Sequence, residues 1–429
     1  MQKISLRELC TSIIADPCIS FSDLKKYLNS KNKEECFLIA SVFANVCPLY
    51  KVKTHTGKVK HRNDVDKVSE LDAILLDYYT IFIKNVLNNK NDDFSYNIAA
   101  YLLDELDHFN FNDRIVAKVI EGTKNLHTKN VCLNVLKNKI LNDTLGEITY
   151  LILDKCIDFK FNYFILECLL NSSFLEKCVK KRIDEENKFQ HKPKAKNEEK
   201  TIYKSNLKFF GKKKISKNAI KIEKKRYKKE NLNKSALKED LEDIDYKIYV
   251  KCINALQRLY FTLLKDKNGK CLISICLGLR KYFKIIRKEF HEGIMFLLYE
   301  NIIKNPEVEN CFVVNSNIIK TVYVMFADAG IEFKKLMVCF NDMLSYGYFY
   351  NIKKNVLEKE ISDLLFLMFF KEKQNNVDLI EVLRKLVCLR ISYHLTFLDT
   401  QIQKLIIFYD VNVWESNFYE FALYQKMLK

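Results

Sequence analysis

Apolar residues recur every three or four positions along almost the whole chain, and this spacing constrains the fold more than any other feature. Four such stripes are Phe94, Ile98, Leu102 and Leu106; Leu133, Leu136 and Ile140; Ile253, Leu256, Tyr260 and Leu263; and Ile318, Val322 and Phe326. No comparable stretch keeps a period of two, and the 429 residues include only 9 Gly and 4 Pro. Sheet-rich folds need many turn residues, so the sequence predicts an all-α protein.

Breaks between the stripes every 12 to 20 residues predict helix boundaries. Asp16-Pro17 should end a first helix, Asn112-Asp113 should cap one that stops near Gly122, Asp143-Thr144 should open another, and Ser316 should cap a later one. Residues 54–66 are polar and contain Gly57, so we expect a loop there. Many mid-length amphipathic helices, each needing neighbours to cover its apolar face, predict an α-solenoid. No fixed-period consensus is visible, so the repeats should be degenerate, as in HEAT or armadillo arrays.

The net charge of +17 is concentrated in the middle of the chain. Residues 180–234 contain 21 Lys and Arg against 7 Asp and Glu, whereas the other 374 residues hold 50 basic and 47 acidic side chains. A nearly neutral body therefore carries one strongly positive segment, which is costly to pack and attracts polyanions. We accordingly expect helical-repeat regions at 1–180 and 243–429, joined over 181–242 by a basic, partly disordered arm that runs into a charged helix.

The central basic segment, residues 208–229 (KFFGKKKISKNAIKIEKKRYKK), is the strongest functional signal. Its eleven candidate RNA-binding residues are Lys208, Lys212, Lys213, Lys214, Lys217, Lys221, Lys224, Lys225, Arg226, Lys228 and Lys229. Neutralised phosphates release condensed counterions, so such a segment favours RNA binding, and the interleaved Phe209, Phe210 and Tyr227 suit stacking on unpaired bases. Two other interpretations stay open at this point: a nuclear-localisation signal alone, and a solvated spacer in a Lys-rich chain.

The sequence offers no constellation typical of catalysis, metal binding or membrane insertion. It lacks phosphate-cradling Gly-rich loops, a Gly-x-Ser-x-Gly elbow, His-Glu-x-x-His and Cys-x-x-Cys. Asp104, Glu105 and Asp107 are better explained as a solvated helix face than as paired catalytic carboxylates, and His291 is scarcely a candidate. We expect no cofactor, no metal and no enzymatic activity.

The cysteines and the apolar runs bear on the cellular compartment. The 14 Cys are interpreted mostly as buried free thiols of a reducing compartment, including Cys132, Cys156, Cys252 and Cys339. The longest strongly apolar run, Leu364 to Phe370, is too short to span a bilayer. Charged residues follow Met1, with no cleavable signal sequence, so we expect a soluble cytosolic or nuclear protein with no membrane partner.

Three motifs in the first part of the chain are similar to consecutive conserved motifs of a known family. Leu6 to Pro17 (LRELCTSIIADP) is similar to an E-L-C-x-x-I-L-x-D/N-P helix. Residues 39–53 (IASVFANVCPLYKVK) resemble the next conserved run, with Leu49 in place of Gly, and Val68 to Leu87 resembles the helix that follows. In these motifs and their order the chain resembles the nucleolar complex protein 3 family.

The resemblance continues in the same order through the second part. Lys212 to Lys229 is similar to the family's basic block, and Glu239 to Asp245 to its acidic stretch. Cys252 to Lys265, Cys276 to Leu297 and Trp414 to Leu428 then resemble the apolar helices that follow in the family. The family's charged N-terminal extension and its terminal His-Tyr-His-Pro have no counterpart here, as in a short divergent member.

The resemblance implies an α-helical repeat protein of the nucleus and nucleolus that acts in ribosome biogenesis. Such a protein would pair with a nucleolar complex protein 2-like helical protein, join pre-60S assembly intermediates and take part in rRNA processing as a non-enzymatic scaffold. Some members are also linked to chromatin and DNA replication initiation. A chromatin-bound replication factor and a HEAT-type transport adaptor are therefore the alternatives. Tyr346–Tyr350 and Phe418–Tyr424 are candidate exposed aromatics for partner binding, of which half or more should prove to be core.

Overall fold

The computed structural model divides the chain into two compact units, residues 1–259 and 260–429. Its described residues are 5–17, 21–52, 63–88, 92–158, 161–190, 246–266, 269–305, 308, 310–326, 333–345, 352–370, 376–410 and 419–428. Within these ranges every regular element is a helix, so the predicted all-α class is confirmed. The predicted limits of the arm at 180 and 242 stay predictions: residue 180 lies within a described helix that continues to Gln190, and residues 191–245 lie outside the described ranges.

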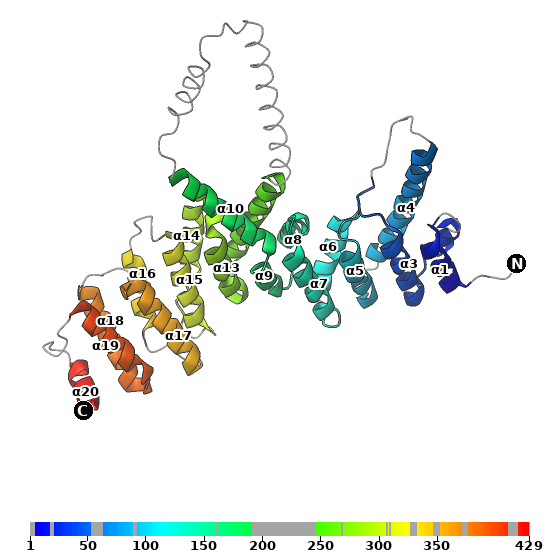
Figure 1. The fold of residues 1–429 in the computed structure, drawn as a ribbon. Helices are drawn as coiled ribbons and strands as arrows, with labels where there is room; N and C mark the ends of the chain where they lie inside the picture. The colour runs from blue at the N-terminus through cyan, green and yellow to red at the C-terminus, as the bar shows by residue number, and fades with distance from the viewer. Residues whose placement is uncertain are drawn as a thin grey trace, which may run out of the picture. The chain divides into compact units, whose positions relative to one another are not determined.

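In unit 1, most helices pack against their next neighbour but one. The elements are α1 (Leu6–Ala15), η1 (Phe21–Lys26), α3 (Lys33–Val46), α4 (Asn63–Asn88), α5 (Asp93–Glu105), α6 (Asn112–Gly122), α7 (Lys129–Asn142), α8 (Glu147–Asp158), α9 (Phe164–Leu169), α10 (Ser173–Gln190) and a helix over residues 246–265. The packing α3 to α5 to α7 to α9 forms one row and α4 to α6 to α8 the other (Figure 1). Two such rows are compatible with a helical solenoid.

The helices of unit 2 also pack into two rows. Its elements are α13 (Gly269–Tyr282), η2 (Phe283–Ile285), η3 (Lys288–Phe290), α14 (His291–Glu300), α15 (Cys311–Phe326), α16 (Phe333–Met343), α17 (Lys354–Leu365), the π-helical turn η6 (Phe366–Phe370), α18 (Asn376–Tyr393), α19 (Phe397–Tyr409) and α20 (Tyr419–Leu428). The packing α13 to α15 to α17 to α19 gives one row and α16 to α18 to α20 the other. Residues 246–265 are helical across the boundary between the two units.

The predicted apolar stripes form the core. Of the residues named in them, only Phe94 and Leu133 are half-buried, and the others are buried. The helix ends at Ala15 and Gly122 also agree with the sequence. Asp143 works as predicted at the start of α8, because its carboxylate accepts hydrogen bonds from the amides of Leu145, Gly146 and Thr149.

Two predicted boundaries are wrong. Residues 63–66 of the predicted loop belong to α4, while residues 54–62 lie outside the described ranges. Ser316 does not cap a helix, because α15 begins five residues earlier, at Cys311. The Ser316 side chain is buried inside α15, where its hydroxyl donates a hydrogen bond to Oε2 of Glu360 on α17. A Ser in a helix interior satisfies its hydroxyl in this way when a neighbouring helix supplies an acceptor.

A buried charge cluster joins α15 to α17 in unit 2. Nζ of Lys320 lies 2.9 Å from Oε2 of Glu360 and 2.7 Å from Oδ2 of Asp363. The side chains of Lys320 and Glu360 are only 8% and 12% exposed, whereas Asp363 is 48% exposed. Nearby, Arg280 of α13 donates to Oδ1 of Asn317 on α15 at 2.8 Å. Polar groups thus connect three successive helices of one row inside an otherwise apolar core.

The described cysteines are free thiols, and most are buried. Cys132, Cys156 and Cys252 are buried as expected, while Cys339 is partly exposed. Burial raises the pKa of Cys132 to about 11, although a hydrogen bond from Thr128 opposes this shift. A thiol with such a pKa is almost fully protonated near neutral pH and therefore a poor nucleophile. The helices within the described ranges include none long and apolar enough to cross a membrane.

Gly146 should be intolerant of a side chain, because it occupies a left-handed conformation with φ of +84° and a Cβ there would lie 2.5 Å from the Phe174 ring. We expect Gly146→Ala to lower the free energy of unfolding by about 2–4 kcal/mol, from backbone strain plus overpacking. Urea unfolding of the full chain measures this. Gly293→Ala is the control, since its Cβ would meet Phe261 at 3.2 Å within a helix, and the two variants should differ by about 2 kcal/mol or more. Equal stabilities would contradict the prediction.

Candidate nucleic-acid interface

The residues predicted to bind RNA lie outside the described ranges. This applies to all eleven: Lys208, Lys212, Lys213, Lys214, Lys217, Lys221, Lys224, Lys225, Arg226, Lys228 and Lys229. The structure therefore neither brings them together nor separates them. It does describe the two helices that flank the central basic segment, α10 on its N-terminal side and the helix over residues 246–265 on its C-terminal side.

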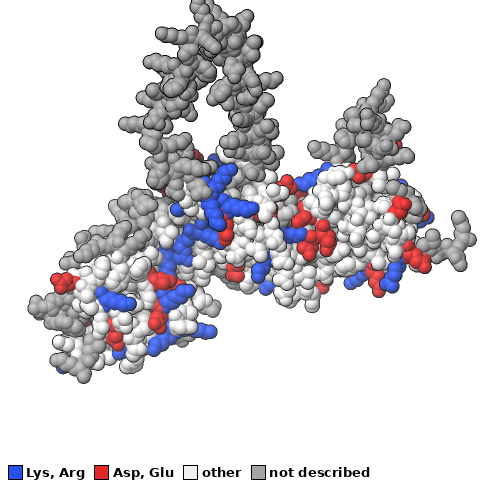
Figure 2. Space-filling model, viewed as in Figure 1, with Lys and Arg blue, Asp and Glu red and all other residues white. Residues whose placement is uncertain are grey.

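One face of α10 is basic and the opposite face is buried. Leu175 and Cys178 are buried, which fixes the orientation of the helix, and α10 packs against α7. Lys177, Lys180 and Lys181 are exposed. A spacing of three or four residues places these ammonium groups on the same side of a helix, so α10 presents a positive stripe to solvent. Figure 2 shows Lys and Arg side chains gathered over α10.

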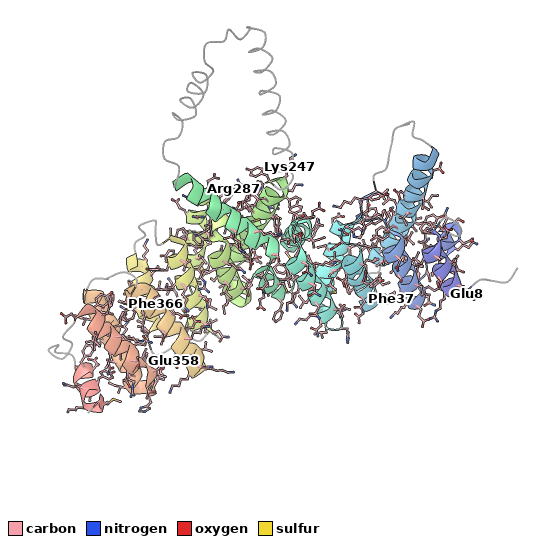
Figure 3. The ribbon with its side chains drawn as sticks, viewed as in Figure 1. Glu8, Phe37, Lys247, Arg287, Glu358 and Phe366 are labelled. Atoms are coloured by element: carbon pink, nitrogen blue, oxygen red, sulfur yellow. The ribbon has the colours of Figure 1, made fainter. Side chains whose placement is uncertain are left out.

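In the unit 1 part of the helix over residues 246–265, one face is likewise buried and the opposite face is basic. Cys252 and Leu256 are buried, whereas Lys247, Lys251 and Arg258 are exposed. Separations of four and seven residues bring the three cations to one side of the helix. Nζ of Lys251 lies 5.6 Å from the centroid of the Tyr150 ring on α8, within cation–π range. Lys247 is marked in Figure 3.

A hydrogen bond of Cys252 and the contact of Lys251 with Tyr150 hold this helix against α8 and the residue that precedes it. The Cys252 thiol donates a hydrogen bond to the carbonyl oxygen of Gly146 at 3.4 Å. Burial raises the pKa of Cys252, and nearby Cys178 and Asp143 raise it further. Cys178 belongs to α10 and Gly146 immediately precedes α8, and both flanking helices contribute to unit 1. We call the six exposed cations Lys177, Lys180, Lys181, Lys247, Lys251 and Arg258 the basic surface.

Two tyrosines lie at the start of the helix over residues 246–265. Tyr246 is 56% exposed, and its ring centroid is 6.2 Å from that of Tyr249, with 25° between the ring planes. Sequence reasoning did not single out these residues. The signal was present in the Tyr-Lys-Ile-Tyr sequence of residues 246–249, where two aromatic residues enclose a basic one.

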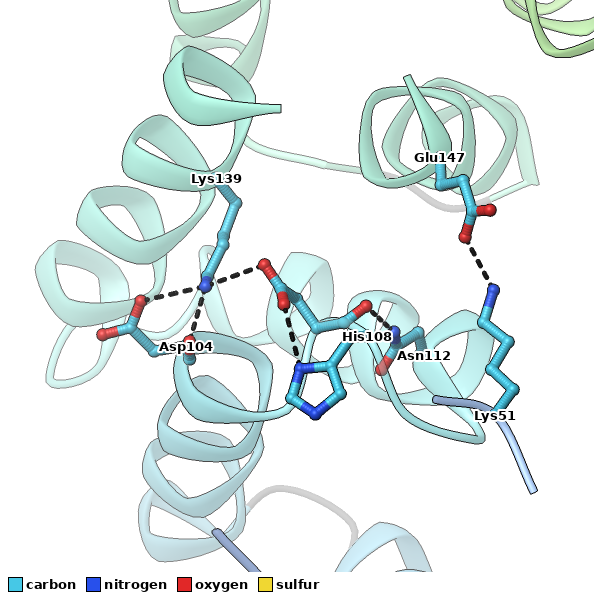
Figure 4. A network of polar contacts seen from close by, with 7 residues as sticks. Lys51, Asp104, His108, Asn112, Lys139 and Glu147 are labelled. Carbon is cyan, nitrogen blue, oxygen red and sulfur yellow. Dashed lines mark hydrogen bonds and ion pairs between the residues drawn. The ribbon is translucent and has the colours of Figure 1, made fainter. Parts of the chain in front are cut away.

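The acidic residues examined as paired carboxylates are held by a lysine. Nζ of Lys139 on α7 lies 3.5 Å from Oδ1 of Asp104 and 3.0 Å from Oδ2 of Asp107 (Figure 4). His108 Nδ1 lies 3.6 Å from Oδ1 of Asp107. A cavity of about 220 Å³ borders Asp104, Asp107 and Lys139. Because Lys139 compensates the two carboxylates and ties the end of α5 to α7, the network serves as a structural clamp.

A second polar contact in Figure 4 ties the segment after α3 to α8. Nζ of Lys51 lies 2.6 Å from Oε2 of Glu147, and both side chains are about half exposed. An exposed pair of this kind contributes about 0–1 kcal/mol to stability. Within the described ranges, the side chains include no group of three or more His, Cys, Asp or Glu arranged to hold a metal ion.

The structure describes only part of the predicted aromatic surface of unit 2. Tyr346–Tyr350 and Phe418 lie outside the described ranges, while Phe421 and Tyr424 are buried, as part of the expected core fraction. Large exposed side chains of unit 2 include Phe366 at 61%, Ile407 at 78% and Phe408 at 40%. The turn η6 and helix α19 bring them together, because Tyr409 donates a hydrogen bond to the carbonyl oxygen of Phe369 at 2.7 Å.

Ring contacts make this a continuous aromatic surface. The Phe370 ring lies 6.5 Å from Phe366 and 5.2 Å from Phe408, measured between centroids. Phe366 is marked in Figure 3. Exposed apolar groups that touch one another across two helices are typical of protein-binding surfaces. We call Phe366, Phe370, Ile407 and Phe408 the unit 2 aromatic surface.

No protein-family model matches the sequence, and a search of curated proteins finds no similar sequence.

Proposed function

We propose that this chain is a non-enzymatic assembly factor of the large ribosomal subunit, which binds pre-ribosomal RNA through its central basic segment and a helical partner protein through its repeats. Binding energy performs this function, and no covalent bond is made or broken. The nuclear and nucleolar location and the large-subunit target rest on the resemblance to the nucleolar complex protein 3 family. Degenerate HEAT or armadillo-like repeats are the architecture that we propose for the two rows of helices in each unit.

The single observation that carries the RNA part is the basic surface. Six exposed cations lie on the two helices that flank the central basic segment, and all six belong to unit 1. A solvated spacer would need no such continuation onto folded helices. A phosphate backbone that follows residues 208–229 would meet further cations on the flanking helices, beyond the acidic stretch at 239–245 on the C-terminal side, and each added phosphate contact releases counterions.

The unit 2 aromatic surface is the contact that we propose for the protein partner. Burying Phe366, Ile407 and Phe408 against an apolar helix face would remove three large exposed side chains from water. Aromatic residues commonly supply most of the binding energy at such interfaces. The resemblance implies that the partner is a nucleolar complex protein 2-like helical protein.

Recovery of crosslinked RNA and co-purified chains from cells tests the proposal. We expect mainly large-subunit precursor RNA together with one helical partner protein. The control is a variant with glutamine at all basic positions of the basic surface and the central segment, carrying a transplanted nuclear-import signal. That variant should reach the nucleus and lose the RNA. Dispersed genomic DNA in place of precursor RNA would contradict the proposal and favour a chromatin-bound replication factor. RNA recovery that is unchanged in the variant would also overturn it.

A further inference from the structure

The aromatic pair at the edge of the basic surface distinguishes between kinds of RNA. Tyr246 exposes more than half of its surface, and Tyr249 lies beside it with its ring at a shallow angle of 25°. Lys247 falls between them in the sequence, and Lys251 follows one helical turn later. Aromatic faces and cations thus occur within six consecutive residues at the start of one helix.

The chemistry of such a pair suits unpaired bases. In an A-form duplex the bases are stacked on one another, so a side chain at the surface reaches phosphates and 2′-hydroxyls but not base faces. An unpaired nucleotide leaves both faces of its base open, and stacking on an aromatic ring is tolerant of base identity. Cations alone would bind both kinds of RNA through phosphates. The tyrosines add a stacking interaction that is available only to the unpaired bases of single-stranded RNA.

The phenol rings are also held in place for this role. Tyr249 is half-buried, and the helix that carries both rings is fixed by the buried Cys252 three residues further on. Lys251, on the same helix, sits over the ring of Tyr150 on α8. Side chains held in this way lose less conformational freedom when a base stacks on them than side chains on a free segment would.

We propose that Tyr246 and Tyr249 form a stacking site for unpaired RNA bases, so that the basic surface binds a single-stranded segment in preference to a duplex. This inference rests on the proposed function, because it requires the basic surface to bind RNA. It concerns the described helix over residues 246–265, and it names the class of RNA that the site selects. Sequence-tolerant stacking predicts preference for strandedness rather than for one base.

Three RNA probes test the stacking site with the full-length chain at a single salt concentration: a 12-nucleotide oligouridine, an abasic strand of equal length and charge, and a 12-base-pair RNA duplex. Replacing both tyrosines with alanine should weaken oligouridine binding about 10- to 100-fold. Affinity for the abasic strand and for the duplex should stay within about twofold of the unaltered chain, because neither offers a free base face. The slope of affinity against salt concentration should not change, since no cation is removed.

Conservative and matched variants separate stacking from a loss of structure. Replacing both tyrosines with phenylalanine keeps the rings and should retain oligouridine binding. Tyr50→Ala is the control for loss of an exposed tyrosine, because Tyr50 is 52% exposed in the same unit and its hydroxyl donates to Asp72. Tyr50→Ala should leave all three affinities unchanged.

The outcomes distinguish failure of this inference from failure of the proposed function. If the unaltered chain binds all three probes with a steep salt dependence, but the alanine pair loses nothing or loses all three equally, the stacking site is wrong and RNA binding stands. If the unaltered chain binds none of the probes, both proposals fail. A selective loss for oligouridine that phenylalanine restores is the result that we expect.

Discussion

Replacing all six residues of the basic surface with glutamine should weaken the binding of single-stranded RNA by about 10²–10³-fold at 100 mM salt. Each phosphate neutralised by a cation contributes a slope of about −0.7 to the plot of log affinity against log salt for a single strand. Loss of six contacts should therefore reduce the magnitude of the slope by about 4. Fluorescence anisotropy with a labelled oligouridine, repeated between 50 and 200 mM salt, measures both quantities.

The central basic segment should contribute a comparable amount by itself. Replacing its eleven basic residues with glutamine should remove about 5 to 8 phosphate contacts. In the unaltered chain, these contacts should make the affinity for RNA fall roughly 10³-fold between 50 and 200 mM salt. Combining both sets of substitutions should leave a weak interaction with a nearly flat salt response. If the central segment accounted for all binding, the six substitutions on the basic surface would change neither affinity nor slope, and the proposed continuous interface would be wrong.

A variant of matched composition controls for net charge alone. It replaces one Arg and five Lys that are exposed elsewhere in unit 1, namely Arg7, Lys25, Lys31, Lys84, Lys124 and Lys137. The formal charge falls by the same six units as in the basic-surface variant. We expect less than a threefold loss of affinity, because these six cations lie outside the two helices that carry the basic surface and salt screens exposed charges. Equal losses in the two variants would show that net charge, and not the basic surface, governs binding.

Much of the fold is predictable from spacing because burial acts on whole helix faces. The stripe of Ile318, Val322 and Phe326 could be recognised, since a helix covers its apolar face only by packing it against neighbours. Boundaries are harder to predict when a distant residue decides them. Ser316 has the chemistry of an N-cap, but its hydroxyl donates a hydrogen bond to Glu360 on another helix. The sequence near residue 316 does not indicate that partner.

The candidate site shows the same limit. The spacing of Lys177, Lys180 and Lys181 is visible in the sequence, but their relation to Lys251 depends on the packing of Cys178 near Cys252, more than seventy residues apart. The burial of individual aromatic side chains is equally hard to predict, because composition does not tell which face of a helix is covered. Tyr424 is buried, whereas Phe366 is exposed, although both lie in apolar helical sequence.

Removing the buried cation of unit 2 should have the largest effect on stability. We expect Lys320→Met to lower the free energy of unfolding by about 3–5 kcal/mol, because it leaves the Glu360 carboxylate buried without its cation. The Met side chain keeps most of the volume of the Lys stem, so the loss reports mainly on charge. Urea unfolding of the full chain, with the linear dependence of free energy on urea, measures the difference.

The double variant decides between charge and packing as the cause. Replacing Lys320 and Glu360 together with Met should recover most of the stability lost in Lys320→Met, since exchanging a buried ion pair for apolar groups of similar volume is often close to neutral. Arg384→Met is the control for exposure: Arg384 and Glu420 form an ion pair at 2.8 Å with 46% and 22% of their side chains exposed, and its loss should cost about 1 kcal/mol or less. If the double variant were as unstable as Lys320→Met, cavity formation and misfit would explain the loss, and the Lys320–Glu360 pair would have no specific role in joining α15 to α17.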